Sequence, residues 1–220
     1  MYTDVLFINR SLNTNVSRIG MFMARDTGSG LPDEEPEQVL WHLIENCAHD
    51  WRHKVRINHD PWLQVLDHDG NIPAAEPVSG LLGENGAGVA RQLGRQLDRR
   101  LGRRLGLKVR AVAGQDKLDV SSTSARRLAQ VAVIRNGRAT AIRKLPTPGL
   151  SVQMDISNRL IFCADMRLAP GAMITADDVN VSLRAFDLAN IRSMTVYMLG
   201  GRRGPKSEAI KFMPADICRW

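Results

Sequence analysis

The sequence is poor in cysteine, in aromatic residues and in long apolar runs. Its three cysteines, Cys47, Cys163 and Cys218, are odd in number and far apart, and no CxxC motif or Cys-His spacing suited to zinc occurs. This pattern fits a reducing cytoplasm and predicts buried or inert thiols. No stretch approaches about eighteen apolar residues, and no positively charged leader precedes an apolar core, so we expect neither membrane insertion nor secretion. We predict a cytoplasmic protein that uses no metal and no cofactor.

Acidic residues are almost absent from residues 86–110. This segment holds eight cations and one acid, Asp98, so its net charge is +7, which equals the formal net charge of the whole 220-residue chain. The remaining sequence has 22 basic residues against 22 acidic ones, because eight of the 30 Lys and Arg and one of the 23 Asp and Glu lie in the segment. The basicity is therefore a local property. The eight cations are Arg91, Arg95, Arg99, Arg100, Arg103, Arg104, Lys108 and Arg110.

The spacing within residues 86–110 predicts an amphipathic helix. Two side-chain ladders recur every four residues, the spacing of residues stacked along a helix. An α-helix turns by about 100° per residue, so the two ladders begin roughly 160° apart around the helix axis. Both rotate around the axis in the same direction along the helix, and they therefore stay on different faces. One face of the predicted helix is apolar and the other is cationic. The apolar ladder is Val89, Leu93, Leu97, Leu101 and Leu105, and the cationic ladder is Arg91, Arg95, Arg99 and Arg103.

Three partners are conceivable for such a cationic face: solvent, an anionic membrane surface or a nucleic acid. Solvated helix faces normally carry both signs of charge, whereas this one repeats like charge four residues apart. Helices that lie on membranes usually carry interfacial aromatic residues, and this segment has none. Arginine in large excess over lysine favours planar phosphate or base-edge ligands. Nucleic acid is the favoured partner, and the solvated and membrane-surface alternatives stay open.

The rest of the chain predicts an α+β protein with one large domain or two small ones. Residues 37–51 fit a second amphipathic helix, with a core stripe of Val39, Leu40, Leu43, Ile44 and Cys47. The predicted organisation is a mixed unit at 1–85, the Arg-rich helix at 86–110 and a mostly antiparallel, β-rich unit at 111–220. Strands are expected at 4–12 and 18–25 as a pair, at 54–57, 62–66 and 192–199, at 128–135 and 138–143 as a hairpin around an Asn136-Gly137 turn, and at 150–156 and 159–164 as a hairpin.

Two further places have an excess of positive charge. Residues 126–144 contain six cations, among them Arg126, Arg127 and Arg135, and no acid, which indicates either a second basic surface or a solvated hairpin. The sequence GGRRGPK at 200–206 offers backbone amides and arginines to a phosphate. It lacks the Gly-Lys-Ser/Thr of a P-loop, so an exposed turn is the alternative.

The order of an Arg-rich helix, a serine pair and a basic strand resembles a known family. The stretches are GVARQLGRQLDRRLGRRL at 88–105, VSSTSARRL at 120–128 and VAVIRNG at 131–137. Over residues 86–137 the chain is similar to the Csy-type CRISPR repeat-processing endoribonucleases of the RAMP superfamily. The resemblance implies a ferredoxin-like unit at 1–85 that supplies a histidine, an Arg-rich helix in the major groove at the base of a repeat stem-loop, and a Ser/Thr cluster near the cleaved phosphate. The first forty residues of this chain, however, contain no histidine.

The resemblance also implies site residues. It assigns Arg91, Arg95, Arg99, Arg100, Arg103 and Arg104 to the stem, and it assigns Ser121, Ser122 and Thr123 to the scissile linkage. Metal-independent cleavage also needs a base for the 2′-hydroxyl and an acid for the leaving oxygen, and histidine serves either role near neutral pH. His49, then His42 and His53, are the candidates, each with a purely structural role as the alternative. Lys108, Arg110, Arg126, Arg127 and Arg135 complete the predicted RNA-binding set.

The sequence therefore predicts a protein that binds an RNA stem-loop, a CRISPR repeat, and cleaves it without metal to give mature guide RNA. It would stay bound to its product in a ribonucleoprotein, together with other subunits of a CRISPR effector complex and without a membrane. The alternative is a non-catalytic RNA- or DNA-binding subunit of a nucleoprotein complex. Substitution of the three histidines distinguishes the two hypotheses. It should abolish cleavage and spare binding if the protein is a nuclease, and it should change no catalysis if the protein only binds.

Overall fold

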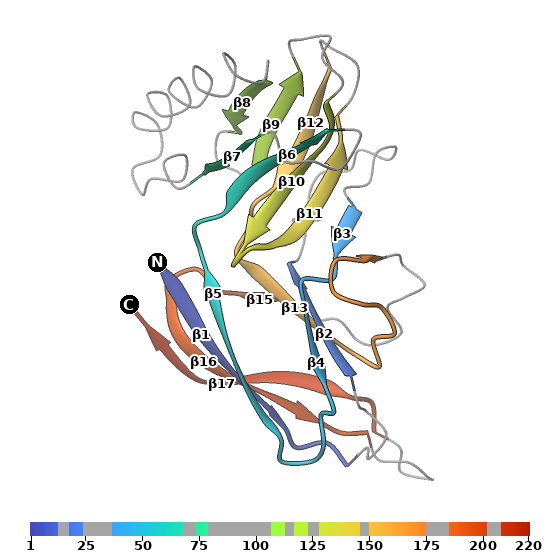
Figure 1. The fold of residues 1–220 in the computed structure, drawn as a ribbon. Coiled ribbons are helices and arrows are strands. Elements are labelled where there is room, and N and C mark those ends of the chain that lie inside the picture. Colours follow the sequence, from blue (N-terminus) through green and yellow to red (C-terminus); the bar gives the residue numbers. More distant parts are fainter. Residues whose placement is uncertain are drawn as a thin grey trace. The chain divides into compact units, whose positions relative to one another are not determined.

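All regular structure in the described part of the chain is β-strand (Figure 1). The structure is a computed structural model, and it describes residues 1–12, 18–23, 37–67, 74–78, 107–112, 117–122, 128–145, 150–174, 185–201 and 208–220. No helix occurs within these ranges. The prediction of an α+β class is therefore wrong, and the fold is all-β. The chain divides into two compact units, each built from more than one segment of sequence.

Unit 1 comprises Met1–Ala24, Gln38–His59 and Asn158–Trp220 and contains two four-stranded sheets. The first sheet has the order β17-β16-β1-β5, in which β1 and β16 are parallel and the other pairs are antiparallel. The second sheet, β15-β13-β2-β4, is antiparallel throughout. The strands of the first sheet are β1 (Tyr2–Asn9), β5 (Arg52–Asn58), β16 (Ile191–Leu199) and β17 (Lys211–Arg219); those of the second are β2 (Arg18–Met23), β4 (His42–Glu45), β13 (Arg159–Ala164) and β15 (Ala185–Asp187).

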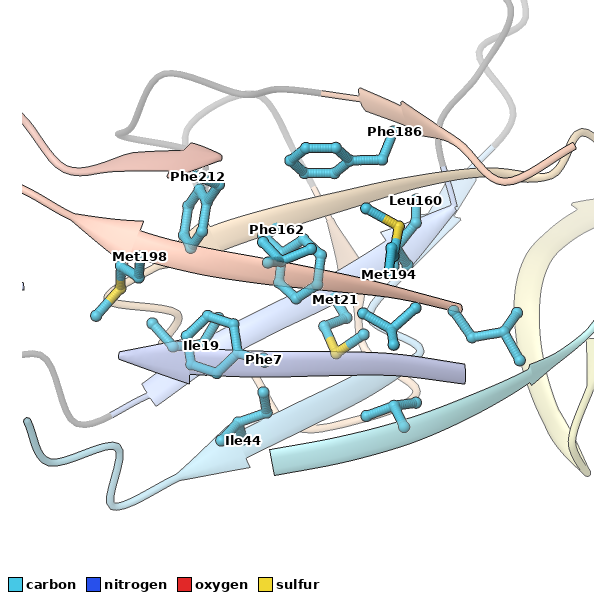
Figure 2. Packing of buried hydrophobic residues seen from close by; sticks show 14 of the residues in the cluster. Phe7, Ile19, Met21, Ile44, Leu160, Phe162, Phe186, Met194, Met198 and Phe212 are labelled. Carbon is cyan, nitrogen blue, oxygen red and sulfur yellow. The ribbon is translucent and has the colours of Figure 1, made fainter. Parts of the chain in front are cut away.

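The two sheets of unit 1 share one hydrophobic core, which contains a cluster of phenylalanines (Figure 2). Phe162 of β13 lies at its centre, with ring centroids 5.7 Å from Phe7, 5.5 Å from Phe212 and 5.8 Å from Phe186. The Phe162–Phe186 pair is edge-to-face, and the other two pairs are stacked, arrangements that add stability beyond area burial. Phe7 is on β1 and Phe212 on β17, so this cluster ties the first sheet to the second.

The predicted helix at 37–51 is wrong. Its residues form β3 (Glu37–Val39), β4 and a turn in which Asn46 and Asp50 have φ values of 54° and 63°. The stripe of apolar residues fits helical spacing, but hydrogen bonding to other strands prevails: β4 pairs with β2, and β3 pairs with β14 (Met173–Ile174). Asparagine and aspartate tolerate the left-handed conformation that these turns require better than most residues.

Unit 2 comprises Arg25–Glu37 and Asp60–Ser157, and its core lies between two groups of strands. One group has the order β11-β10-β6-β7 and the other β12-β9-β8, with antiparallel neighbours in both. The core is mostly valine, for example Val65, Val120, Val131 and Val152. The strands are β6 (Trp62–Asp67), β7 (Ala74–Pro77), β8 (Leu107–Ala111), β9 (Lys117–Ser122), β10 (Leu128–Arg135), β11 (Arg138–Lys144) and β12 (Ser151–Asp155).

One predicted hairpin is confirmed and two are wrong. Strands β10 and β11 pair around Asn136 and Gly137, whose φ values of 50° and 73° are those expected of an Asn-Gly hairpin turn. In contrast, β1 pairs with β16 and β5 and not with β2, and β12 pairs with β9 while β13 joins β2 and β15. The strands themselves were predicted, but closeness in sequence did not decide which of them pair.

The predicted Arg-rich helix falls mostly outside the described residues, which exclude 86–106. The last part of the prediction is wrong, because residues 107–110 belong to β8 and pair with β9. Exposure along this stretch alternates with a period of two, with Lys108 and Arg110 exposed and Val109 buried against the core. Positions 202–206 of the GGRRGPK loop also lie outside the described residues.

Truncation of Phe162 should destabilise unit 1 strongly. The side chain is fully buried and contacts three other phenylalanines, so Phe162→Ala should lower the free energy of unfolding by about 3–5 kcal/mol. Chemical denaturation followed by fluorescence measures this change. Met213→Ala, at an exposed position of β17, is the control and should change the free energy by less than about 0.5 kcal/mol. Equal effects of the two substitutions would contradict this account of the core.

Candidate functional site

The strands β12, β9 and β8 form a three-stranded group in unit 2 (Figure 1). One face of this group is apolar and the other is polar. The valines at positions 109, 120 and 152 are buried in the core of the unit. Residues between them face the other way, and the register sets them in rows across the strands. We call this surface the polar face. Its first row is Lys108, Ser121 and Ser151, and its second row is Arg110, Asp119 and Gln153.

The polar face brings together two sets of residues that were predicted separately. Lys108, predicted to bind RNA, lies directly opposite Ser121, predicted to act near the scissile phosphate. Directly opposed residues of antiparallel strands have Cβ atoms about 4.5–5.5 Å apart, so the ammonium and hydroxyl groups can contact one phosphate. Lys108 and Arg110 are exposed and Ser121 is half-buried. Ser122 is the next residue of β9 and pairs with Leu107.

Asp119, Ser151 and Gln153 were not predicted as site residues. The sequence does contain a signal for them, since LKVRA at 107–111 and KLDVSS at 117–122 alternate between apolar and polar residues with the period of a strand. What the sequence does not contain is the register that aligns the three strands. Thr123, Arg126 and Arg127 lie outside the described residues, as do the six stem arginines from Arg91 to Arg104.

Arg135 is at the core of unit 2 and not on its surface. Its exposed fraction is 1%, and its Nη2 donates hydrogen bonds to the carbonyl oxygens of Ile156 and Ser157, at 2.7 and 3.2 Å. These bonds tie the end of β10 to the segment after β12. A buried guanidinium that donates to backbone carbonyls positions the chain, and in this conformation it offers nothing to a ligand at the surface.

The predicted histidines lie in unit 1, and two of them are in contact. His42 is on β4 and His53 on β5, and their Nε2 atoms are 3.0 Å apart with ring centroids 5.3 Å apart. Both strands are edges of their sheets, so the pair joins the edge of one sheet to the edge of the other. Both side chains are half-buried. One of these two nitrogens must donate and the other accept, so one proton lies between the two Nε2 atoms.

His49 does not share in this contact. It lies in the turn between β4 and β5, where its Nδ1 is 2.8 Å from the carbonyl oxygen of Ser11 and its Nε2 is 3.5 Å from the carboxylate of Asp50. The ring is exposed. Of the three candidates, His42 and His53 are therefore the two arranged for proton transfer between imidazoles. They belong to unit 1, whereas Ser121 and Ser122 belong to unit 2.

The environment of His53 favours its neutral form. Burial lowers the pKa of His53 from its ordinary value of 6.5, because the charged imidazolium loses hydration. Acid–base cleavage needs a neutral imidazole as base and a protonated one as acid, and the lowered pKa suits His53 to the role of base. Among the described residues, no group of three or more His, Cys, Asp and Glu side chains is arranged to hold a metal ion.

Two of the three thiols are inert, as predicted from the sequence. Cys47 and Cys163 are buried, and burial raises the pKa of each to about 11, so both stay protonated at neutral pH. Cys218, on β17, is exposed. Within the described ranges, no helix is long and apolar enough to cross a membrane.

Comparisons with protein-family models, with curated proteins and with solved structures find no match to this chain.

Acidification should destabilise unit 1 through the histidine pair. Because the pKa of His53 is lower in the folded state than in the unfolded state, the unfolded chain binds a proton at His53 more readily below about pH 6.5. The free energy of unfolding should therefore decrease as the pH falls from about 6.5 toward the pKa of the folded state. His53→Gln should remove part of this pH dependence. Denaturation midpoints between pH 8 and pH 5 measure the effect. Arg52→Gln, which changes the neighbouring exposed residue of β5, should retain the wild-type dependence, and an unchanged slope in His53→Gln would refute the assignment.

Proposed function

We propose that the chain binds structured RNA through residues 86–110 and the adjoining polar face. The observation that carries this proposal is the location of the charge: the segment is +7 and the rest of the chain is neutral. RNA is a polyanion, and each Lys or Arg that neutralises a phosphate releases a counterion, which supplies much of the binding free energy. A protein that merely needed solubility would gain nothing by placing its whole charge excess in 25 residues.

The polar face supports this proposal. Lys108 and Arg110 are the last two cations of the basic segment, and both are exposed on β8. Beside them, Ser121, Ser151 and Gln153 offer donors and acceptors that can contact phosphate oxygens and the 2′-hydroxyl. The buried valines on the opposite face hold these strands in place, so the polar groups are arranged before the ligand arrives. A rigid polar surface next to a cationic segment favours the duplex part of a stem-loop.

Charge substitutions should test the proposed RNA contact. Reversing Arg95, Arg99 and Arg103 together to Glu should weaken binding of a stem-loop RNA by at least about 100-fold at moderate salt. The milder Lys108→Gln/Arg110→Gln variant should reduce the slope of log affinity against log salt by about two, one for each lost phosphate contact. Titration of a labelled stem-loop at several salt concentrations measures both. Arg167→Gln, an exposed cation of unit 1, is the control, and unchanged affinity in the triple variant would remove the basis of the proposal.

The histidine pair favours cleavage as a second candidate function. In this proposal, neutral His53 removes the proton of a 2′-hydroxyl, which attacks the adjacent phosphorus, and protonated His42 gives a proton to the departing 5′-oxygen. The P–O5′ bond breaks, leaving a 2′,3′-cyclic phosphate and a free 5′-hydroxyl, with no change in oxidation state. The pair must open so that the RNA lies between the two imidazoles. The resemblance to CRISPR repeat-processing enzymes suggests a repeat stem-loop as the substrate.

Cleavage and binding can be separated by experiment. The chain should be purified from its host after nuclease treatment and a high-salt wash, and the RNA bound to it should be sequenced. A discrete stem-loop that ends in a 2′,3′-cyclic phosphate is the expected result. His42→Gln and His53→Gln should each abolish cleavage and leave affinity for the stem-loop within about two-fold, whereas His49→Gln should cleave normally. Bound RNA with heterogeneous ends would indicate a non-catalytic RNA-binding subunit.

A further inference from the structure

Unit 1 carries an exposed row of aromatic and cationic side chains. Tyr2 at the start of β1 and Trp220 after β17 meet edge to face, with ring centroids 6.1 Å apart. The guanidinium of Arg56 lies 4.2 Å from the centroid of Tyr2, and that of Arg192 lies 5.6 Å from the centroid of Trp220. Tyr2 is 39% exposed and Trp220 57% exposed. Contacts therefore link Arg56 to Tyr2, Tyr2 to Trp220 and Trp220 to Arg192 at one end of the β17-β16-β1-β5 sheet.

The strand β5 extends this row with more positive charge. Arg52, Lys54 and Arg56 are exposed, whereas Val55 and Ile57 between them are buried in the core of unit 1. The sheet thus has a core-facing side and an outer side, and the cations of β5 lie on the outer side. Because β5 is an edge strand, these cations also form the border of the sheet.

A single acid organises the cations near Tyr2. The carboxylate of Asp4 is 2.8 Å from Nε of Arg56 and 3.3 Å from Nζ of Lys54. Its hydrogen bond with Arg56 lowers the pKa of Asp4, so the carboxylate stays charged at neutral pH and holds the guanidinium over Tyr2. Two cations of β5, Lys54 and Arg56, contact this one acid, and Arg52 is exposed further along the strand, so the cations of β5 outnumber Asp4.

We propose that this outer surface of unit 1 binds single-stranded RNA, with bases stacked on Tyr2 and Trp220 and phosphates held by the surrounding cations. Flat exposed rings bordered by cations match a ligand that alternates flat bases with anionic phosphates. The rings of Tyr2 and Trp220 are inclined by 85°, so they cannot clamp one base between them. In an edge-to-face pair the edge of one ring also covers part of a face of the other, so bases stack on the ring surface that neither an arginine nor the neighbouring ring covers.

This site goes beyond the proposed function, because it lies in unit 1 and uses none of the residues 86–110. It reads the unpaired part of an RNA by stacking, whereas the basic segment recognises a duplex by charge. Loss of either site therefore has a separate signature: loss of stacking lowers affinity for unpaired RNA, and loss of the basic segment lowers affinity for the stem.

The test is titration of the full chain with a labelled oligouridine of about eight nucleotides. Trp220→Ala and Tyr2→Ala should each weaken binding by about 5- to 100-fold, the range for loss of one stacked base, while Trp220→Phe and Tyr2→Phe retain most of the affinity. Trp51→Ala is the matched control, since Trp51 belongs to the same unit and is 49% exposed. Equal affinity of the Trp220→Ala and wild-type proteins, or an equal loss in Trp51→Ala, would overturn the proposal.

Two further measurements keep the outcome decisive. Photocrosslinking of wild-type protein to a 4-thiouridine oligonucleotide needs no variant to fold, and adducts on peptides that contain Tyr2 or Trp220 are expected; adducts confined to other peptides would overturn the proposal. In the Arg95, Arg99 and Arg103 charge-reversal variant, residual binding of oligouridine should still depend on Trp220. If stem binding survives that reversal while Trp220→Ala still weakens oligouridine binding, the proposed function fails and the stacking site stands.

Discussion

The parallel pairing of β1 with β16 is the constraint on which the rest of unit 1 depends. It aligns Asp4 with Ser193, residues near opposite ends of the sequence, and leaves β1 with β5 on its other side. The residues of β1 that point inward, such as Val5 and Phe7, then meet the second sheet, and those that point outward, such as Tyr2, stay at the surface. A single strand therefore sets both the core of the unit and its outward row of aromatic side chains.

In both units the sheets have one apolar side, which packs in the core, and one side that carries polar groups. In unit 2 the valines close the core while Lys108, Ser121 and Ser151 share a row. In unit 1 the phenylalanines close the core (Figure 2) while Arg56 lies over Tyr2. Core packing fixes the backbone, and the backbone fixes the spacing of the outward groups. An extended chain of phosphates and bases is the kind of ligand that such spaced rows can contact at several points at once.

Local sequence predicted several of the strands but missed others, among them β9 and β17, and it predicted strand pairing poorly. The Asn136-Gly137 turn was predictable because its two left-handed residues are a short-range signal. The error at residues 37–51 arose because an apolar stripe that fits a helix fits two short strands equally well when other strands are available to pair. The contact of His42 with His53 was not predictable, since it depends on two sheet edges that meet. The row from Arg56 to Trp220 likewise joins residues far apart in the sequence.

The β1–β16 pairing also orders events during synthesis. At about 5–20 residues per second, a ribosome needs roughly 10–40 s to pass from Asp4 to Ser193, and throughout that time β1 has no parallel neighbour. Its antiparallel partner β5 is available early, whereas its parallel partner β16 is synthesised only after unit 2. Unit 2 lies between β1 and β16 in the sequence, so all of its strands leave the ribosome before β16 does. One side of β1 therefore stays without its strand partner while all the strands of unit 2 are synthesised.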